Sequence, residues 1–493
     1  MANIFVKKPL SQLLGEAAAQ GEGTLKRTLG AWNLLALGIG AIIGAGLFVR
    51  TASAAASSAG SAVTMSFIVA AIGCAFAGLC YAEFAAMIPI AGSAYTYAYT
   101  TMGELVAWVI GWALIMEYAL GAATVSIAWS EYLNKLLGGA IPYQWCHSPF
   151  QEQVLNGATT GVHGIMNLPA LVILALLTAV LIKGTQESAR ANAIIVFIKV
   201  SIVLIFIAVG FGFINEANHT PYMIPAGTIG HEGFFKHGYG GVLGGAAIVF
   251  FAFIGFDAVS TAAQEAKNPG KDMPIGILGS LVVCTVLYIL FAHVLTGVAP
   301  WTDFADPEKG KEASVAYAIS QYMTGYGWLA TAVTVAILAG FSSVILVMLM
   351  GQSRVFFTMS KDGLMPSVFG QVHPKFNTPY MSNIIVFGFV SLFAAFIPGD
   401  VAGDLTSFGT LLAFVIVCIG IPIMRKSDPN ANRPFRAPLV PLVPILGILV
   451  CTGMIVALDK VTLISAVIWM VAGLGVYFAY GQRNSKLQRE KTL

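Results

Sequence analysis

A glycine-rich stretch in the first apolar segment is the part of the sequence best suited to bind a small ligand. Residues 38–48 read Gly-Ile-Gly-Ala-Ile-Ile-Gly-Ala-Gly-Leu-Phe. A helix within lipid keeps its backbone N–H and C=O groups paired internally, because no water is present to pair with them. A turn unwound at Gly44, Ala45 and Gly46 would direct free amides and free carbonyls towards a ligand, and these groups attract opposite charges. The carboxylate and ammonium groups of an amino acid match both.

A second interruption, Phe251-Ala252-Phe253-Ile254-Gly255-Phe256-Asp257, lies in the sixth apolar segment. The first glycines have another explanation, because Gly40 and Gly44 have the GxxxG spacing of closely packed helices. Paired broken segments in corresponding positions of two halves favour a transporter site instead. We also predict that one aromatic side chain beside the second break, Phe251, covers the ligand.

Lys199 lies near the middle of the fifth apolar segment, deeper than its four-carbon stem comfortably reaches to water. Ionisable residues in the membrane interior are costly and are functional candidates for that reason. Because burial disfavours a charged ammonium group, a lysine at this depth could lose and regain a proton near neutral pH. In its charged form it could contact carbonyls of the broken first segment.

Four acidic residues are further candidates, each with an alternative that the sequence leaves open. Glu117 could recognise a cationic side chain, carry a proton or form a hydrogen bond between helices. Asp257 could cap the helix after the second break or take part in proton coupling. Glu83 is expected to be a packing contact or a cytoplasmic gate. Glu265 is either an inner-gate residue or part of a solvated helix end.

The composition requires a polytopic membrane protein. The 493 residues are 57% hydrophobic and 10% charged, whereas soluble domains are about 25% charged. We therefore predict an all-α membrane protein with twelve transmembrane helices, each long enough to cross about 30 Å of hydrocarbon. The twelve segments lie near residues 31–54, 61–88, 105–130, 167–183, 190–214, 241–265, 275–298, 325–352, 380–397, 403–424, 438–457 and 462–481.

The distribution of lysine and arginine predicts the orientation of the chain. Most of them fall on the side of the membrane that holds both termini, so the termini are expected to be cytoplasmic and the protein to reside in the cell membrane. The sequence has no metal-ligand spacing, phosphate loop or nucleophile with a base, so we predict no metal, no cofactor and no enzymatic activity.

Four motifs together resemble the amino acid–polyamine–organocation (APC) superfamily, and within it bacterial homologues of the cationic amino acid transporters. They are the stretches 38–48 and 251–257, Glu-Ala-Lys-Asn-Pro at 265–269, and Arg354 with Asp362-Gly363-Leu364. The resemblance extends over residues 25–480. It implies the LeuT-type fold, with two inverted five-helix repeats and two extra helices. The expected units are 1–29 (cytoplasmic segment), 30–214 (first repeat), 241–424 (second repeat), 438–481 (two additional helices) and 482–493 (cytoplasmic tail).

The resemblance also implies roles for individual residues. The substrate carboxylate would bind the amides around Gly44, and its ammonium group would bind the carbonyls of Ile42, Phe251 and Ile254. Lys199 matches a lysine of proton-coupled relatives, near Ser342 and Ser343. The predicted substrate-binding residues are Ile42, Ile43, Gly44, Ala45, Gly46, Ile115, Met116, Glu117, Phe251, Ala252, Ile254 and Gly255. Lys199 and Asp257 are predicted to couple protons, and Phe251 and Glu265 to gate the site.

The predicted function is proton-coupled symport of L-amino acids by alternating access. The substrate would be small and neutral, such as alanine, or cationic, such as arginine, because the lining combines Ile115 and Met116 with Glu117. A proton-independent amino acid exchanger is the alternative, and an amino acid sensor is less favoured because the tail after the last segment is short. The expected partners are the amino acid, the proton, membrane lipids including a sterol, and a small single-helix membrane protein, but no nucleic acid.

Overall fold

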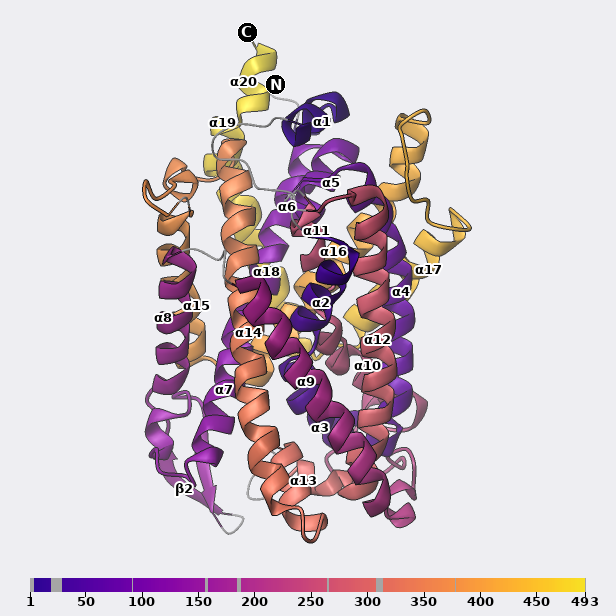
Figure 1. Cartoon of the computed structure of the whole chain (residues 1–493), viewed down its shortest axis with the longest axis vertical. Helices are drawn as coiled ribbons and strands as arrows, with labels where there is room; N and C mark the ends of the chain where they lie inside the picture. Colours follow the sequence, from indigo (N-terminus) through magenta and orange to yellow (C-terminus); the bar gives the residue numbers. More distant parts are fainter. Residues whose placement is uncertain are drawn as a thin grey trace.

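Helices make up most of the protein, and the longest run along the long axis of the molecule (Figure 1). The computed structural model describes residues 4–18, 29–90, 92–155, 158–183, 188–263, 266–306, 314–376 and 378–492. Glu265, one of the two predicted gating residues, lies outside the described residues.

The helices of the first half are α1 (Leu10–Ala18), α2 (Ala31–Ile42), α3 (Thr51–Ala54), α4 (Val63–Met87), α5 (Ser93–Thr101), α6 (Glu104–Ile115), α7 (Gly121–Leu136), α8 (Leu168–Lys183) and α9 (Ser188–Gly210). Those of the second half are α10 (Gly238–Val249), α11 (Ala258–Thr261), α12 (Pro269–Val298), α13 (Ser314–Tyr322), α14 (Gly327–Lys361), α15 (Tyr380–Phe396), α16 (Gly399–Ser427), α17 (Leu442–Val456), α18 (Lys460–Val476), α19 (Gln482–Asn484) and α20 (Lys486–Thr492).

The helices have the length and composition expected of a membrane protein. Eight helical stretches within the described residues are long and apolar enough to cross a bilayer, and the longest of them is Gly46–Met87. Four shorter apolar helices, α2, α8, α15 and α17, accompany them. The predicted helical membrane class agrees with this architecture. The twelve crossings and the two inverted repeats stay predictions.

A two-stranded hairpin, which the sequence analysis did not predict, lies in the connection between α7 and α8. Strand β1 (Glu152–Leu155) pairs antiparallel with β2 (Ala158–His163), and Glu152 faces His163 in the register. Thr159, Thr160 and Val162 are β-branched residues, which favour extended backbone. Figure 1 shows the hairpin at one end of the molecule and both chain termini at the other.

Small residues let α2 approach α12 closely. A Cβ atom on Gly276 of α12 would lie 2.8 Å from Leu34 Cβ of α2, and one on Gly38 of α2 would overlap Ser280 of α12. Close approach through glycine is a common basis of helix association in membranes, where lipid supplies no hydrophobic driving force. The packing places the end of α2, where the first break begins, beside the middle of α12.

Candidate functional site

The first glycine-rich stretch is a break between two helical segments. Helix α2 ends at Ile42, and Ile43 leaves the helix with φ −72° and ψ 102°. The helix resumes at Ala45 and continues as a π-helical turn over Gly46–Arg50. The first amides of a helix have no partner within it. The break thus places amides of one half-helix beside carbonyls at the end of the other.

The second break follows α10. A 3-10 turn over Phe250–Phe253 leads to Ile254, with ψ 133°, and the chain re-enters a helix at Ala258. Gly255 has φ +114°, which side-chain-bearing residues rarely adopt, and a Cβ atom there would lie 2.9 Å from Ala41 O of the first break. Glycine is needed at this position both for its conformation and for the approach of the two breaks.

The two breaks touch each other directly. A Cβ atom on Gly46 would overlap the backbone of Ala252. The hydroxyl of Tyr288, on α12, lies 2.9 Å from Ile42 O and 2.9 Å from Ala252 O, so it bridges one carbonyl of each break. The sequence analysis missed Tyr288. The available signal was a tyrosine near the middle of the seventh apolar segment.

Replacing Tyr288 by phenylalanine should destabilise the protein, because two buried carbonyls lose their shared donor. We expect the free energy of unfolding to fall by about 1 to 3 kcal/mol, the usual cost of an unsatisfied buried polar group. Thermal unfolding of the purified protein measures the change. Tyr239→Phe is the control, because the Tyr239 side chain is 79% exposed. Equal melting temperatures for the two variants would contradict the bridging role.

Lys199 reaches the first break from α9. Its Nζ donates to Gly40 O at 2.6 Å and to Ile43 O at 2.9 Å, and the residue is 1% exposed. A Cβ atom on Gly340 of α14 would lie 3.0 Å from Lys199 Cδ, so glycine leaves room for the lysine stem. The side chain therefore points into the protein and does not extend to the surface. Ser342, predicted nearby, donates to Leu338 O of its own helix.

Glu117 and Asp257 form a buried acidic pair beside the second break. Both residues are fully buried, and their carboxyl groups are near enough to influence each other electrostatically. Asp257 accepts hydrogen bonds from Tyr118 OH at 3.0 Å and from Gly255 N at 3.3 Å, but it makes no side-chain cap to α11. Of the two alternatives for Asp257, the side-chain cap is absent from the structure, and the role in proton coupling stays a prediction. Neither Glu117 oxygen has a hydrogen-bond partner among the described residues. An ionised carboxylate accepts hydrogen bonds but cannot donate one, so two ionised carboxylates cannot form a hydrogen bond with each other.

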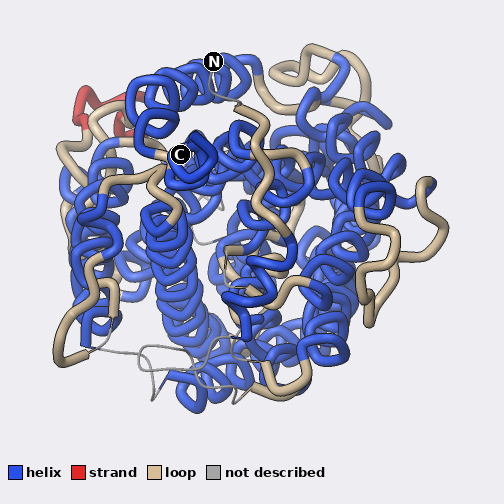
Figure 2. Tube along the Cα trace, turned by 90° about the horizontal axis from the view of Figure 1, so that it is seen from above, coloured by secondary structure: helices blue, strands red, loops and turns tan. Residues whose placement is uncertain are grey.

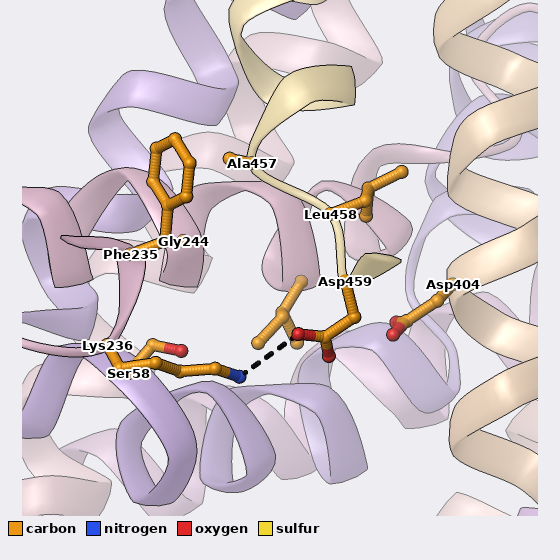
Figure 3. Close-up of a pocket in the computed structure, with 9 residues that line it drawn as sticks. Ser58, Phe235, Lys236, Gly244, Asp404, Ala457, Leu458 and Asp459 are labelled. Carbon is orange, nitrogen blue, oxygen red and sulfur yellow. Dashed lines mark ion pairs between the residues drawn. The ribbon is translucent and has the colours of Figure 1, made fainter. Parts of the chain in front are cut away.

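Phe251 lies beside an ion pair that joins the first broken segment to α16. The Arg50 guanidinium is 6.0 Å from the centre of the Phe251 ring and pairs with Asp404 of α16. Arg50 is 4% exposed and Phe251 is 5% exposed. Beyond this pair is a surface pocket where Asp404 lies near Asp459, which pairs with Lys236 at 3.4 Å (Figure 3).

Separating Arg50 from Asp404 should destabilise the protein through the charge left behind. We expect Arg50→Met to lower the free energy of unfolding by about 2 kcal/mol, less than for a fully buried pair because the Asp404 side chain is 15% exposed. Adding Asp404→Leu should restore part of the loss, because no unpaired charge then remains. Melting temperatures of both single variants and the double variant test this, and strictly additive losses would contradict the pairing.

The remaining predicted residues occupy two other positions. Ile115 and Met116 are buried where α6 continues into a π-helical turn, and a Cβ atom on Gly409 of α16 would lie 2.9 Å from Met116 Cβ. Glu83 packs between helices as one member of an ion pair. Its carboxylate accepts two hydrogen bonds from Arg425, at 3.0 and 2.6 Å, and one from Ala437 N. It ties α4 to the end of α16 and to the chain that follows.

Comparison with known proteins decides the family. The sequence model of a family described as amino acid permease matches residues 29–478. The chain belongs to the amino acid permease family. The predicted membership of the APC superfamily is confirmed.

The sequence similarity to known proteins covers most or nearly all of the permease. The branched-chain amino acid permease BcaP of Bacillus subtilis is 43% identical over 487 residues, which are 99% of each chain. The methylthioribose transporter of the same organism is 41% identical over 99% of this chain and 100% of its own. The vacuolar cationic amino acid transporter 4 of Arabidopsis thaliana is 30% identical over 83% of this chain and 65% of its own. These relatives are permeases and transporters, so the chain is a multi-pass membrane transporter and not an enzyme.

Proposed function

We propose that this permease is a proton-coupled L-amino acid symporter that works by alternating access. The observation that carries the proposal is the position of the Lys199 ammonium group, which donates to Gly40 O and Ile43 O at the first break. A titratable cation at that position links the charge of one side chain to the geometry of the backbone that would bind substrate.

The breaks supply the groups that an amino acid backbone needs. Amides at Gly44, Ala45 and Gly46 begin a half-helix, where a carboxylate is favoured by the partial positive charge. Carbonyls of Ile42, Phe251 and Ile254 are the proposed partners of the substrate ammonium group. Tyr288 occupies Ile42 O in this structure. Substrate would compete with that hydroxyl or share the carbonyl, which has two lone pairs.

Lys199 would couple substrate binding to the proton. When charged, it holds the carbonyl end of α2 in place through two hydrogen bonds. A neutral amine has no charge to attract those carbonyls, so loss of the proton would loosen α2 and weaken the substrate site. Asp257, next to Glu117, is a second proposed proton position.

We propose an apolar or small L-amino acid as the preferred substrate. Ile115 and Met116 would line its side chain, and Glu117 faces Asp257. The names of the similar proteins specify branched-chain amino acids, methylthioribose and cationic amino acids, so substrates of three kinds need testing. A cationic substrate would have to reach the buried carboxylate of Glu117.

The membrane context completes the proposal. Both termini would face the cytoplasm in the cell membrane, and they lie at the same end of the molecule. Exposed apolar residues on α9 and α18, such as Phe197 and Ile468, would contact lipid, a sterol or a small single-helix partner.

Uptake into proteoliposomes tests the function. Labelled leucine, alanine, arginine and methylthioribose are supplied outside, with and without an inward proton gradient, and empty liposomes are the control. We expect accumulation above the equilibrium level when the outside is acidic, and its loss when a protonophore is added. Uptake that ignores the gradient and requires amino acid inside would establish the exchanger instead.

A further inference from the structure

Residues 4–8 lie along the turn between α5 and α6. Glu104 N donates to Val6 O at 3.0 Å, Leu105 N to Ile4 O at 3.0 Å, and Lys8 N to Tyr99 O at 3.2 Å. Gly103, in the turn, has φ +99°, and a Cβ atom there would lie 2.5 Å from Phe5 O. The backbone of the amino-terminal segment is thus docked on a site that glycine keeps open.

The carboxy-terminal segment docks on the same turn from another direction. Glu104 is fully buried and accepts hydrogen bonds from Ser485, Gln488 and two tyrosines, with Gln488 Nε2 at 2.5 Å and Tyr477 OH at 3.0 Å. Gly363, just after α14, has φ +84°, and a Cβ atom there would overlap Asn484 O. A second glycine therefore leaves room for the second terminal segment.

Asp362 joins the two segments to each other. Its carboxylate accepts from Lys8 Nζ at 3.0 Å and from Tyr95 OH at 2.8 Å, and its backbone carbonyl accepts from Lys486 N at 3.1 Å. Figure 1 shows α1, α5, α19 and α20 at the same end of the molecule, and Figure 2 shows both termini on that face. We call residues 4–18 and 482–492 together the terminal strap.

The elements under the strap lead to the half-helices of both breaks. Ser260 of α11 donates to Ser93 Oγ of α5 at 2.9 Å. Lys267 N donates to Leu29 O at 2.8 Å, so the chain after α11 is tied to the start of α2. A displacement of α2 or α11 away from the bundle would therefore disturb the contacts of α5, and the strap is docked on α5.

We propose that the terminal strap holds this end of the permease closed, and that its release is required for substrate to leave there. Glu104 and Asp362 are positioning residues in this device, since both act through the segments that they hold. The proposal rests on the proposed alternating access, because a strap has no such role in a protein that never opens.

Cysteine accessibility tests the strap without any substrate. Thr96→Cys lies beneath the amino-terminal segment, in a pocket also lined by Lys8 and Asp362, and it reports undocking of the strap. Ser260→Cys, on α11, reports opening of the path behind it. Labelling rates with a polar thiol reagent are measured on the full-length protein in lipid nanodiscs, after subtracting the rate of the protein without the added cysteine.

Glycine substitutions release the strap with a matched control. Gly363→Ala would push Asn484 away, and Gly103→Ala would push Phe5 away. Gly325→Ala has the same backbone strain, with φ +86°, but a Cβ atom there has open space around it. We expect Gly363→Ala and Gly103→Ala to raise both labelling rates about tenfold, as for the loss of roughly one hydrogen bond between uncharged groups, and Gly325→Ala to leave them unchanged.

The outcomes separate the strap from the transport function. Faster labelling of Thr96→Cys with unchanged labelling of Ser260→Cys would overturn the proposal, because the segments would then undock without opening the path. Unchanged labelling at both positions would overturn it as well. A permease that shows no proton-driven uptake but still responds at both cysteines would contradict the symport proposal and leave the strap intact.

Lys8→Met, which removes one contact of Asp362, should raise the labelling rates at both cysteine positions in the same way. This variant checks that the faster labelling does not depend on replacing a glycine.

Discussion

Replacing Lys199 by methionine is expected to abolish proton-driven accumulation of the amino acid, while the protein still folds. Methionine keeps an unbranched side chain beside Gly340 but cannot donate to Gly40 O and Ile43 O. We expect proton-driven uptake to fall about 100-fold, the rate equivalent of losing one hydrogen bond to a charged group at 1.36 kcal/mol per decade. Uptake of labelled amino acid into proteoliposomes, with the outside at several pH values, measures it.

The dependence of uptake on the outside pH gives the direction of the expected effect. If the lysine takes up the coupled proton from outside, uptake by the unchanged protein should rise as the outside becomes more acidic. Uptake by Lys199→Met should not depend on outside pH, since the titrating group is gone. Lys199→Ala, which also leaves a cavity, should lose thermal stability as well. A methionine variant that still accumulates substrate against its gradient would show that the proton travels by another group, with Asp257 the next candidate.

The positions of both breaks could be predicted because their causes are local. Glycines at 44, 46 and 255 interrupt apolar segments, and the structure has a break at each place. The depth of Lys199 in its segment could likewise be read from hydropathy, and its side chain does point inward. Local composition thus identifies where backbone groups become free and where a charge is buried.

Partners distant in sequence could not be predicted. Tyr288 and Ile42 are 246 positions apart, and Arg50 and Asp404 are 354 apart. No periodicity or motif relates such positions, because the contacts arise from how α12 and α16 pack against the first break. The structure buries Arg50 beside Phe251, a position that the charge distribution of the sequence does not indicate. Its position only two residues after the glycine-rich stretch was the one available signal.

Close packing, the alternative explanation offered for the glycines of the first stretch, is compatible with the proposed site. Gly46 lies where the two breaks meet, and a Cβ atom there would overlap Ala252. A Cβ atom on Gly44 would lie 3.1 Å from Val344 of α14. Close packing and the proposed ligand binding therefore require the same small residues, because the amides and carbonyls can converge only if the two broken segments touch.

Gly46→Ala is expected to remove substrate binding and to destabilise the protein. The added methyl group meets the backbone of Ala252, which cannot rotate away as a flexible side chain could. The breaks must then separate, so the amides and the carbonyls no longer face one ligand. Overpacking of this kind costs about 1 to 3 kcal/mol or more, and we expect no measurable binding of a substrate that the unchanged protein transports.

Gly388→Ala is the matched control for Gly46→Ala, because it adds the same methyl group to α15, where a Cβ atom has open space. Alanine is favoured over glycine within a helix by up to about 1 kcal/mol, so this variant should bind normally and melt at an equal or higher temperature. Isothermal titration and thermal unfolding of both variants decide the matter. If Gly46→Ala binds substrate with unchanged affinity, the contact between the breaks does not shape the site. If Gly46→Ala binds substrate weakly but melts at the normal temperature, the methyl group does not separate the two breaks. It then acts on the ligand directly, and Gly46 lies against the substrate.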